Sequence, residues 1–86
     1  MKEYEKILKA LANRRRLQIL KYLKDKKQGT VTALAGHLKL SFKSTSKHLA
    51  VLFGAGIVDK EQRSLTMIYY IANPLPKIAK QILELL

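Results

Sequence analysis

Residues 41–54 read Ser-Phe-Lys-Ser-Thr-Ser-Lys-His-Leu-Ala-Val-Leu-Phe-Gly, and this stretch decides the fold. On a helical wheel, Leu49 and Leu52 lie within about 40° of Thr45, so these three side chains form one inward face. The opposite side is small, polar and cationic, with Lys43, Ser46, Lys47 and Ala50. The pattern predicts a helix over 42–53 with one face in the core and one face open to another molecule.

A shorter helix is expected just before this one. Thr32 is a suitable N-cap for a helix over 33–38, which carries leucines four residues apart. Residues 39–41 then form a three-residue turn, in which Ser41 caps the following helix. Two helices joined by such a turn are typical of a helix-turn-helix.

A β-hairpin is expected after the second helix. Gly54 and Gly56 end that helix, and residues 57–61 and 67–71 are rich in β-branched and aromatic side chains. The polar segment 62–66 between them reads as the hairpin loop. A helix-turn-helix followed by a hairpin is a winged helix-turn-helix, with the hairpin as the wing.

Further helices are expected on both sides of this unit. A first helix over 2–12 precedes a second over 14–26, which Asn13 caps. Asn73-Pro74 supplies the cap and the first-turn proline of a last helix over 74–86. The fold is therefore expected to be mainly α with a small hairpin, in the order α-α-α-α-β-β-α.

The composition fits one small domain over 1–86 and excludes several classes of protein. The chain has 17 Lys and Arg against 6 Asp and Glu, a net charge of +11, and no cysteine. It can therefore form no disulfide, thiolate metal site or cysteine nucleophile. The start of the chain does not resemble a signal peptide, and no apolar run approaches the roughly 18 residues of a membrane span. We expect a cytoplasmic protein that does not bind membranes.

The positive charge indicates a polyanionic partner, with nucleic acid first among them. Residues 1–28 carry +7, residues 29–56 carry +3 and residues 57–86 carry +1. The middle segment contains no acidic residue, so the lysines on the outer face of helix 42–53 have no carboxylate beside them in sequence. The major groove of DNA, about 12 Å wide, accepts one such helix.

The candidate contacts to double-stranded DNA lie on the helix over 42–53, with one more on the wing. Lysines can meet phosphates or guanine edges, serines can meet phosphates or either base type, and a helix N-terminus favours a phosphate. Phe42 could contact a thymine methyl group or hold the turn, and His48, at the border of the core face, could pack or reach a phosphate. The candidates are Ser41, Phe42, Lys43, Ser44, Ser46, Lys47, His48 and Arg63.

The first and last helices are apolar over a width that one small core can hardly cover. We predict a two-fold homodimer through them, so the DNA target should be an inverted repeat with half-sites about one helical turn apart. The predicted interface residues are Tyr4, Ile7, Leu8, Leu11, Leu75, Ile78, Ile82, Leu85 and Leu86.

Two strings of residues carry a resemblance to a known family. Ser-x-His-Leu-x-x-Leu-x-x-x-Gly-Ile-Val spans 46–58, and Asn-x-x-Arg-Leu-x-Ile-Leu spans 13–20. Together with the rest of the chain they resemble the ArsR-type winged helix-turn-helix transcriptional regulators. The resemblance implies a homodimer of the first and last helices, a recognition helix over 42–53, a wing over 57–71, repression of transcription and a DNA contact by His48.

The chain departs from this family where its members sense metals. Some members carry cysteines in the first helix of the helix-turn-helix, where this chain has none over 33–38, and others place ligands on the last helix, where this chain offers only Glu84. His37 and His48 have no carboxylate or thiolate nearby in sequence. We expect no metal and no cofactor. The wing is also sparse in charge, with Lys60 and Arg63 as its basic residues.

No catalytic constellation is evident. Residues 44–47 match Ser-x-x-Lys, but the enzymes with that motif need further motifs and a much larger fold. The carboxylates are not paired for acid–base work, so we expect no enzyme. Two alternatives remain open: a winged-helix module that binds nucleic acid without reading its sequence, and an interaction module that binds a protein through its terminal helices.

Overall fold

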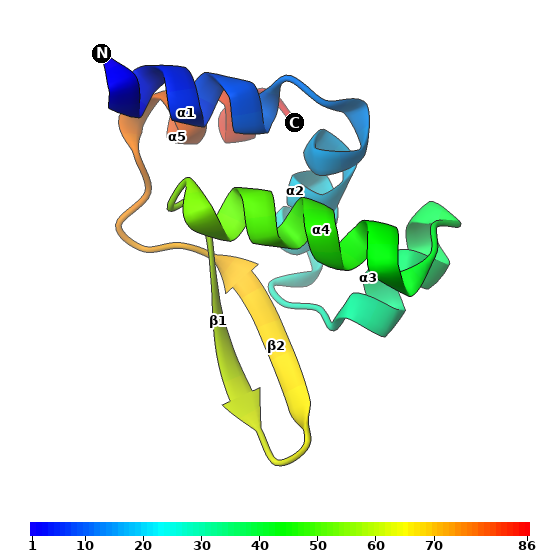
Figure 1. Cartoon of the computed structure of the whole chain (residues 1–86). Coiled ribbons are helices and arrows are strands. Elements are labelled where there is room, and N and C mark those ends of the chain that lie inside the picture. The colour runs from blue at the N-terminus through cyan, green and yellow to red at the C-terminus, as the bar shows by residue number, and fades with distance from the viewer.

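Five helices and one hairpin make up the chain, and the computed structural model describes residues 1–86 (Figure 1). The elements are α1 (Lys2–Leu11), α2 (Arg14–Lys26), α3 (Val31–Leu38), α4 (Phe42–Gly54), β1 (Val58–Arg63), β2 (Thr66–Ile71) and α5 (Lys77–Leu85). The predicted order of elements is confirmed. None of the helices has the length and apolar character needed to cross a lipid bilayer.

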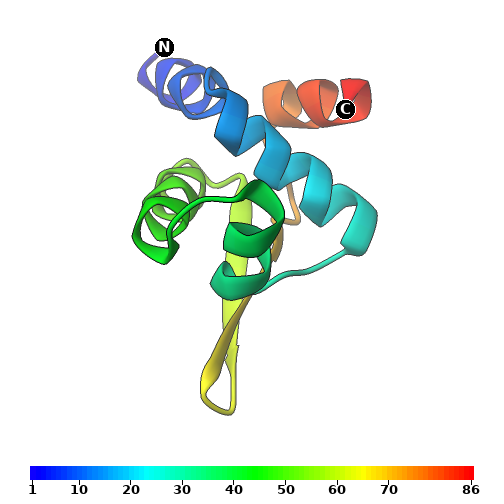
Figure 2. The same cartoon turned by 90° about the vertical axis from the view of Figure 1, so that its right-hand side faces the viewer.

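α2 lies at the centre of the fold, where it packs against α1, α3, α4, α5 and β2. Figure 2 shows it running between the pair α1 and α5 on one side and the pair α3 and α4 on the other. Its Ile19, Leu20 and Leu23 are almost completely buried. The predicted cap is confirmed, because the Asn13 side chain accepts a hydrogen bond of 3.1 Å from the backbone N–H of Arg16.

α3 begins earlier than predicted. The cap is Thr30, whose hydroxyl oxygen accepts a hydrogen bond of 3.0 Å from the backbone N–H of Ala33. The prediction that Thr32 caps this helix was wrong, because the earlier start brings Val31 into the helix and buries it to 8% exposure. A start at Thr30 gains both the cap hydrogen bond and the burial of Val31. A start at Thr32 would gain the cap but not the burial of Val31.

α4 matches its prediction closely. Ser41 accepts a hydrogen bond of 3.0 Å from Ser44 N–H, and the Thr45 hydroxyl donates to Ser41 O at 2.9 Å. Thr45, Leu49 and Leu52 are completely buried, so the predicted inward face is confirmed.

The end of α4 differs by one residue from its prediction. Gly54 is still helical, and the chain turns at Gly56, whose φ of +74° favours a glycine. The backbone N–H of Ile57 then reaches back to Leu52 O at 3.0 Å.

The hairpin has a tighter turn than predicted. β1 and β2 are antiparallel and paired from Val58 with Ile71 to Arg63 with Thr66, which leaves only Ser64 and Leu65 in the turn. The predicted loop over 62–66 was therefore too long. Polarity alone made these residues look like a loop, but exposed strand residues on a wing are polar too.

The base of the hairpin is tied to the loop that precedes α3. Gly29 and Tyr69 exchange two backbone hydrogen bonds, of 3.0 and 2.8 Å. A Cβ atom on residue 29 would lie 2.9 Å from Cε1 of Tyr22, so any larger residue here would force the Tyr22 ring to shift. The contact fixes the direction of the wing relative to the helices.

The last helix starts at Lys77, three residues later than the predicted start of 74. A residue that precedes proline is disfavoured in the helical region, so Leu75 stays outside the helix and Pro76 takes the N-cap position. α5 lies beside α1 at the upper side of Figure 1, where Ala10 and Ala79 are both buried.

The corrected start of α3 predicts unequal effects of two threonine substitutions. Thr30→Ala removes the cap of α3 and should lower the free energy of unfolding by about 0.5–2 kcal/mol. Thr32→Ala, two residues along on the exposed side of α3, should change it by less than about 0.5 kcal/mol. Urea denaturation of both variants measures the difference. A larger loss in Thr32→Ala than in Thr30→Ala would contradict the cap seen here.

Candidate nucleic-acid interface

The outer face of α4 carries most of the candidate DNA contacts. Lys43, Lys47 and Ala50 are exposed, and Ser44 and Ser46 are half-buried at the edges of this face. The inner face of the same helix is held in the core. The structure therefore brings the predicted helix contacts together on one surface.

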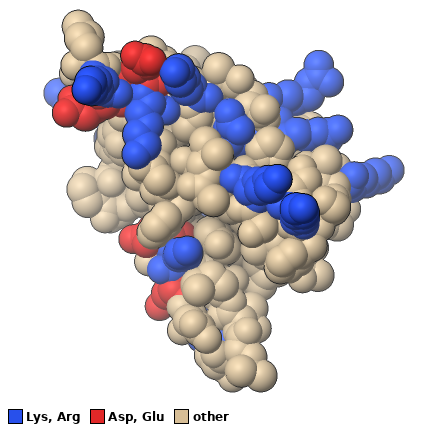
Figure 3. Space-filling model, in the orientation of Figure 1, with Lys and Arg blue, Asp and Glu red and all other residues tan.

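The lysines of α4 have no acidic partner. The ion pairs of the chain join Lys9 to Glu5, Lys21 to Asp25 and Arg63 to Glu61, all on other elements. Figure 3 shows blue side chains gathered over α1 and over the side of the molecule formed by α3 and α4. In the same view, red side chains lie over α1 and the hairpin. The surface of α4 is therefore positively charged without local compensation.

The start of α4 presents an apolar side chain. Phe42 is 61% exposed, and it lines a shallow hollow of about 320 Å³ with residues 30–32 and 65–67. So exposed a ring contributes little to holding the turn. Of its two predicted roles, the structure leaves the ring free for a contact with another molecule. Ser41, directly before it, uses its hydroxyl oxygen in the helix cap.

The wing is less basic than its composition indicates. Arg63 donates hydrogen bonds from Nε and Nη2 to Glu61 Oε1, at 3.0 and 2.6 Å. The Lys60 ammonium lies 4.5 Å from the centre of the Phe53 ring. Both basic groups of the hairpin are thus engaged within the chain, and Asp59 and Glu61 balance their charge.

His48 lies half-buried at the edge of the α4 face, as its place on the wheel indicated. Its Nδ1 is 3.3 Å from Nη1 of Arg16 on α2. Burial, followed by the positive charges of Arg16 and Arg15, lowers the pKa of His48 below its ordinary value of 6.5. Both effects favour the neutral form of the ring. Arg16 was not among the predicted contacts, although it is the Arg of the string over 13–20.

The helix next to α4 carries the second histidine. His37 is exposed on α3, and its ring centre lies 5.0 Å from that of Tyr22. The structure brings no three His, Asp or Glu side chains together around a position that could hold a metal ion.

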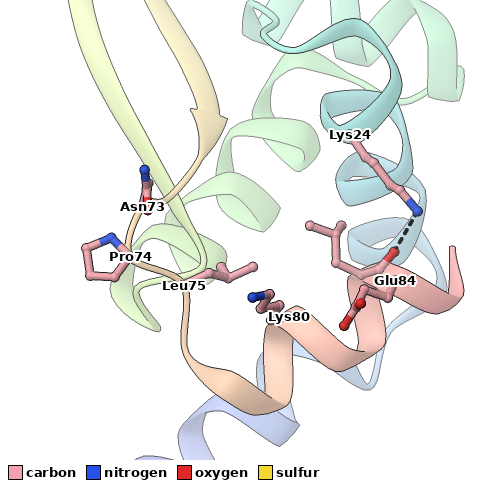
Figure 4. Close-up of a pocket in the computed structure, with 7 residues that line it drawn as sticks. Lys24, Asn73, Pro74, Leu75, Lys80 and Glu84 are labelled. Atoms are coloured by element: carbon pink, nitrogen blue, oxygen red, sulfur yellow. Dashed lines mark hydrogen bonds between the residues drawn. The ribbon is translucent and has the colours of Figure 1, made fainter.

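A second hollow, of about 460 Å³, lies away from α4, between α2 and α5 (Figure 4). Lys24 donates a hydrogen bond of 3.0 Å to Leu83 O across one side of it. Lys80 and Glu84 contribute one charge of each sign, and Leu75 lines its wall. Two lysines and one glutamate line the hollow, so its net charge is only +1.

The predicted interface residues divide into three groups by their exposure. Ile7 and Leu11 belong to the core of their own chain, so they contribute little to any outer surface. Tyr4 and Leu8 are about half exposed, and Leu85 is 82% exposed. The others are half-buried: Leu75, Ile78, Ile82 and Leu86.

Comparison with known proteins identifies the family. Residues 13–60 match the profile described as "Bacterial regulatory protein, arsR family". The transcriptional activator HlyU of Vibrio cholerae is 40% identical over 67 residues, which are 78% of this chain and 61% of HlyU. The chain therefore spans about three fifths of the length of this curated relative.

Solved structures share the fold over almost the whole chain. Reduced HlyU from V. cholerae has a TM-score of 0.82 at 36% identity and covers 96% of this chain and 83% of its own. The transcriptional repressor PagR of Bacillus anthracis has a TM-score of 0.82 at 29% identity, covering 99% and 94%. A homodimeric winged helix-turn-helix DNA-binding domain from Mycobacterium bovis has a TM-score of 0.83 at 28% identity, covering 98% and 74%.

These findings confirm the predicted winged helix-turn-helix and the resemblance from which the family was inferred. They also confirm that the chain is not an enzyme, because its relatives are regulators of transcription. Since the profile matches more than half of the residues and HlyU is 36% identical over 96% of the chain, the chain belongs to the ArsR family of bacterial transcriptional regulators.

Proposed function

We propose that this regulator binds double-stranded DNA as a homodimer and reads an inverted-repeat operator with α4. One observation carries the proposal: the outer face of α4 holds two exposed lysines, Lys43 and Lys47, without an acidic partner. The opposite face is locked into the core by Thr45, Leu49 and Leu52, so the lysines have one fixed direction.

The side chains of this face suit both parts of a DNA site. Lysines can bind phosphates or guanine O6 and N7, and the serines can bind phosphates or bases. We assign Ser41 and the first amides of α4 to a phosphate, and the exposed Phe42 ring to a thymine methyl group. The proposed contacts are Ser41, Phe42, Lys43, Ser44, Ser46, Lys47 and His48.

The wing adds a weaker contact in this proposal. Arg63 is paired with Glu61, but both side chains are about half exposed. Exposed ion pairs contribute only about 0–1 kcal/mol, so a DNA phosphate can replace the carboxylate at small cost. The main electrostatic attraction would come from α4 and the other helices.

A second copy of the chain would cover the apolar surface of α1 and α5. Met1, Tyr4, Leu8 and Ala12 line a hollow of about 520 Å³ on α1, and Leu85 extends outward from α5. Large exposed apolar side chains on one side of a small domain favour an interface. The M. bovis relative is described as homodimeric, which supports the same assembly here.

A dimer has direct consequences for the DNA site. Its two α4 helices would enter major grooves about 34–36 Å apart, one turn of the double helix. Two copies carry a charge of +22, which strengthens attraction to the phosphates.

The direction of regulation depends on the position of the operator relative to the promoter. HlyU is described as an activator and PagR as a repressor, although both share this fold. We propose that this regulator represses where its operator overlaps a promoter.

Selection of bound duplexes from a random library tests the proposed function. At about 150 mM salt, phosphate contacts alone are weak, so an enriched inverted repeat is expected only if α4 reads bases. Binding without enrichment, lost as salt rises, would indicate the non-specific nucleic-acid module. No DNA binding at all would favour the protein-interaction module and contradict the proposal.

Removal of one lysine from α4 should weaken specific binding far more than removal of a lysine elsewhere. Lys47→Ala should weaken binding to the selected duplex about tenfold, the loss expected for one good contact. Lys26→Ala removes the same charge at the end of α2, on the opposite side of the molecule from α4 in Figure 2, and should change binding less than about twofold. Fluorescence anisotropy at fixed salt measures both. Equal losses would mean that total charge, rather than α4, determines affinity.

Charged substitutions on α1 or α5 should separate the dimer. Leu8→Glu and Leu85→Glu each place a carboxylate in the proposed apolar interface, so sedimentation velocity should show a monomer at micromolar concentration. Leu65→Glu is the matched control, because Leu65 is 97% exposed at the tip of the wing and should leave the dimer intact. A dimer that persists in both of the first two variants would place the interface elsewhere.

A further inference from the structure

The guanidinium of Arg16 joins three helices at one point. From the first turn of α2, its Nε donates to Ala10 O at 2.6 Å and its Nη2 donates to Lys9 O at 3.0 Å, both in the last turn of α1. Its Nη1 lies 3.3 Å from Nδ1 of His48 on α4. The same side chain therefore contacts the end of α1 and the edge of the α4 outer face.

Local structure explains why Arg16 occupies this position. The cap by Asn13 sets the direction of the first turn of α2, directly after α1 ends. The last carbonyl groups of a helix lack partners within that helix, and a positive charge near them is favourable. Arg16 satisfies two of these carbonyl groups, which holds its guanidinium still beside His48.

The contact with Arg16 determines which nitrogen of His48 carries the proton. A guanidinium has donors but no acceptor, so Nδ1 of His48 must accept the hydrogen bond with its lone pair. A neutral imidazole has one N–H group, which is then on Nε2. Nε2 makes no hydrogen bond within the chain, and the ring lies at the border of the surface assigned to DNA.

We propose that Arg16 is a positioning residue for DNA recognition, which holds His48 in the Nε2–H tautomer and so directs one hydrogen-bond donor toward DNA. The proposal rests on the proposed function and extends it, because it adds a residue outside α4 that does not itself have to touch DNA. The acceptor chemistry is a phosphate oxygen or the O6 or N7 atom of guanine.

The electrostatics of the site agree with this role. Arg16 and Arg15, both on α2, are the charged groups that lower the pKa of His48 in addition to its burial. They disfavour a second proton on the ring, and so favour the neutral imidazole whose Nδ1 accepts from Arg16. Only below the lowered pKa does protonation replace the acceptor by a second donor and break the contact with Arg16.

Nitrogen chemical shifts of the histidine rings in free protein test the proposal without DNA. At pH 7 the wild-type chain should show His48 with a protonated Nε2 and an unprotonated Nδ1. Arg16→Gln should give a mixture of both tautomers and a higher pKa for His48. Arg15→Gln is the matched control, because it removes the same charge. The Arg15 side chain hydrogen-bonds only to Gln18 Oε1 and Leu38 O, and not to His48. The Arg15→Gln variant should raise the pKa of His48 and keep the tautomer.

Two results in the free protein would overturn the proposal. One is a wild-type His48 with its proton on Nδ1, which needs no variant to observe. The other is an unchanged tautomer in Arg16→Gln. If Arg16→Gln fails to fold because the end of α1 is uncapped, the wild-type measurement still decides, because a proton on Nδ1 overturns the proposal without any variant.

Binding to the selected duplex tests the link to recognition. Arg16→Gln and His48→Ala should each weaken binding about tenfold, and the double variant should be no weaker than either, because Arg16 acts through His48. Arg15→Gln combined with His48→Ala should instead multiply the separate losses. Multiplied losses for the Arg16 and His48 pair would overturn the proposal.

The way in which binding is lost in His48→Ala identifies the DNA group that accepts the hydrogen bond from Nε2. Relaxed preference at one base pair indicates a guanine edge, and an equal loss on all duplexes that keep the repeat indicates a phosphate. If no duplex is enriched by the wild-type chain, the proposed function fails, while the tautomer measurements still decide whether Arg16 orients His48.

Discussion

The burial of Ile19, Leu20 and Leu23 on α2 is the constraint on which the rest of the structure depends. α2 packs against every helix and against β2, so its apolar stripe is shared by the whole domain. A domain of this size has little apolar surface to spare. Rotation of α4 would expose Leu49 or Leu52, at a cost of about 1.5–3 kcal/mol for each side chain. The core therefore fixes the outward face of α4, and with it the direction of the lysines proposed to meet DNA.

The distribution of charge divides the surface into parts with different roles. On α4 the lysines are free, whereas on the hairpin Arg63 and Lys60 are engaged by Glu61 and Phe53. A hairpin with balanced charge has a weak long-range attraction to phosphates. In the proposed complex, α4 would contact the DNA first, and the wing would make its contacts afterwards. In this chain, the unpaired positive charge of the family's fold therefore lies on the helices rather than on the hairpin.

Arg16 connects the two surfaces on which the proposed function depends. α1 contributes apolar side chains to the proposed dimer interface, and α4 contributes the proposed DNA contacts. The Arg16 guanidinium binds the end of α1 and contacts His48 at the edge of α4. A shift of α1 relative to α4 would have to stretch or break these hydrogen bonds. In the proposed dimer, the packing of α1 and the orientation of His48 would therefore be linked through a single side chain.

The sequence by itself determined the order of elements, the inner and outer faces of α4 and the caps at Asn13 and Ser41, because helical periodicity and capping act within one or two turns. The tertiary structure decided between Thr30 and Thr32 as the cap of α3, since both are good caps and only the burial of Val31 separates them. It also assigned Ile7 and Leu11 to the core of the chain rather than to its outer surface. The contact of Arg16 with His48 joins residues 32 positions apart. Such contacts depend on how helices pack in three dimensions, and no local pattern of residues encodes them.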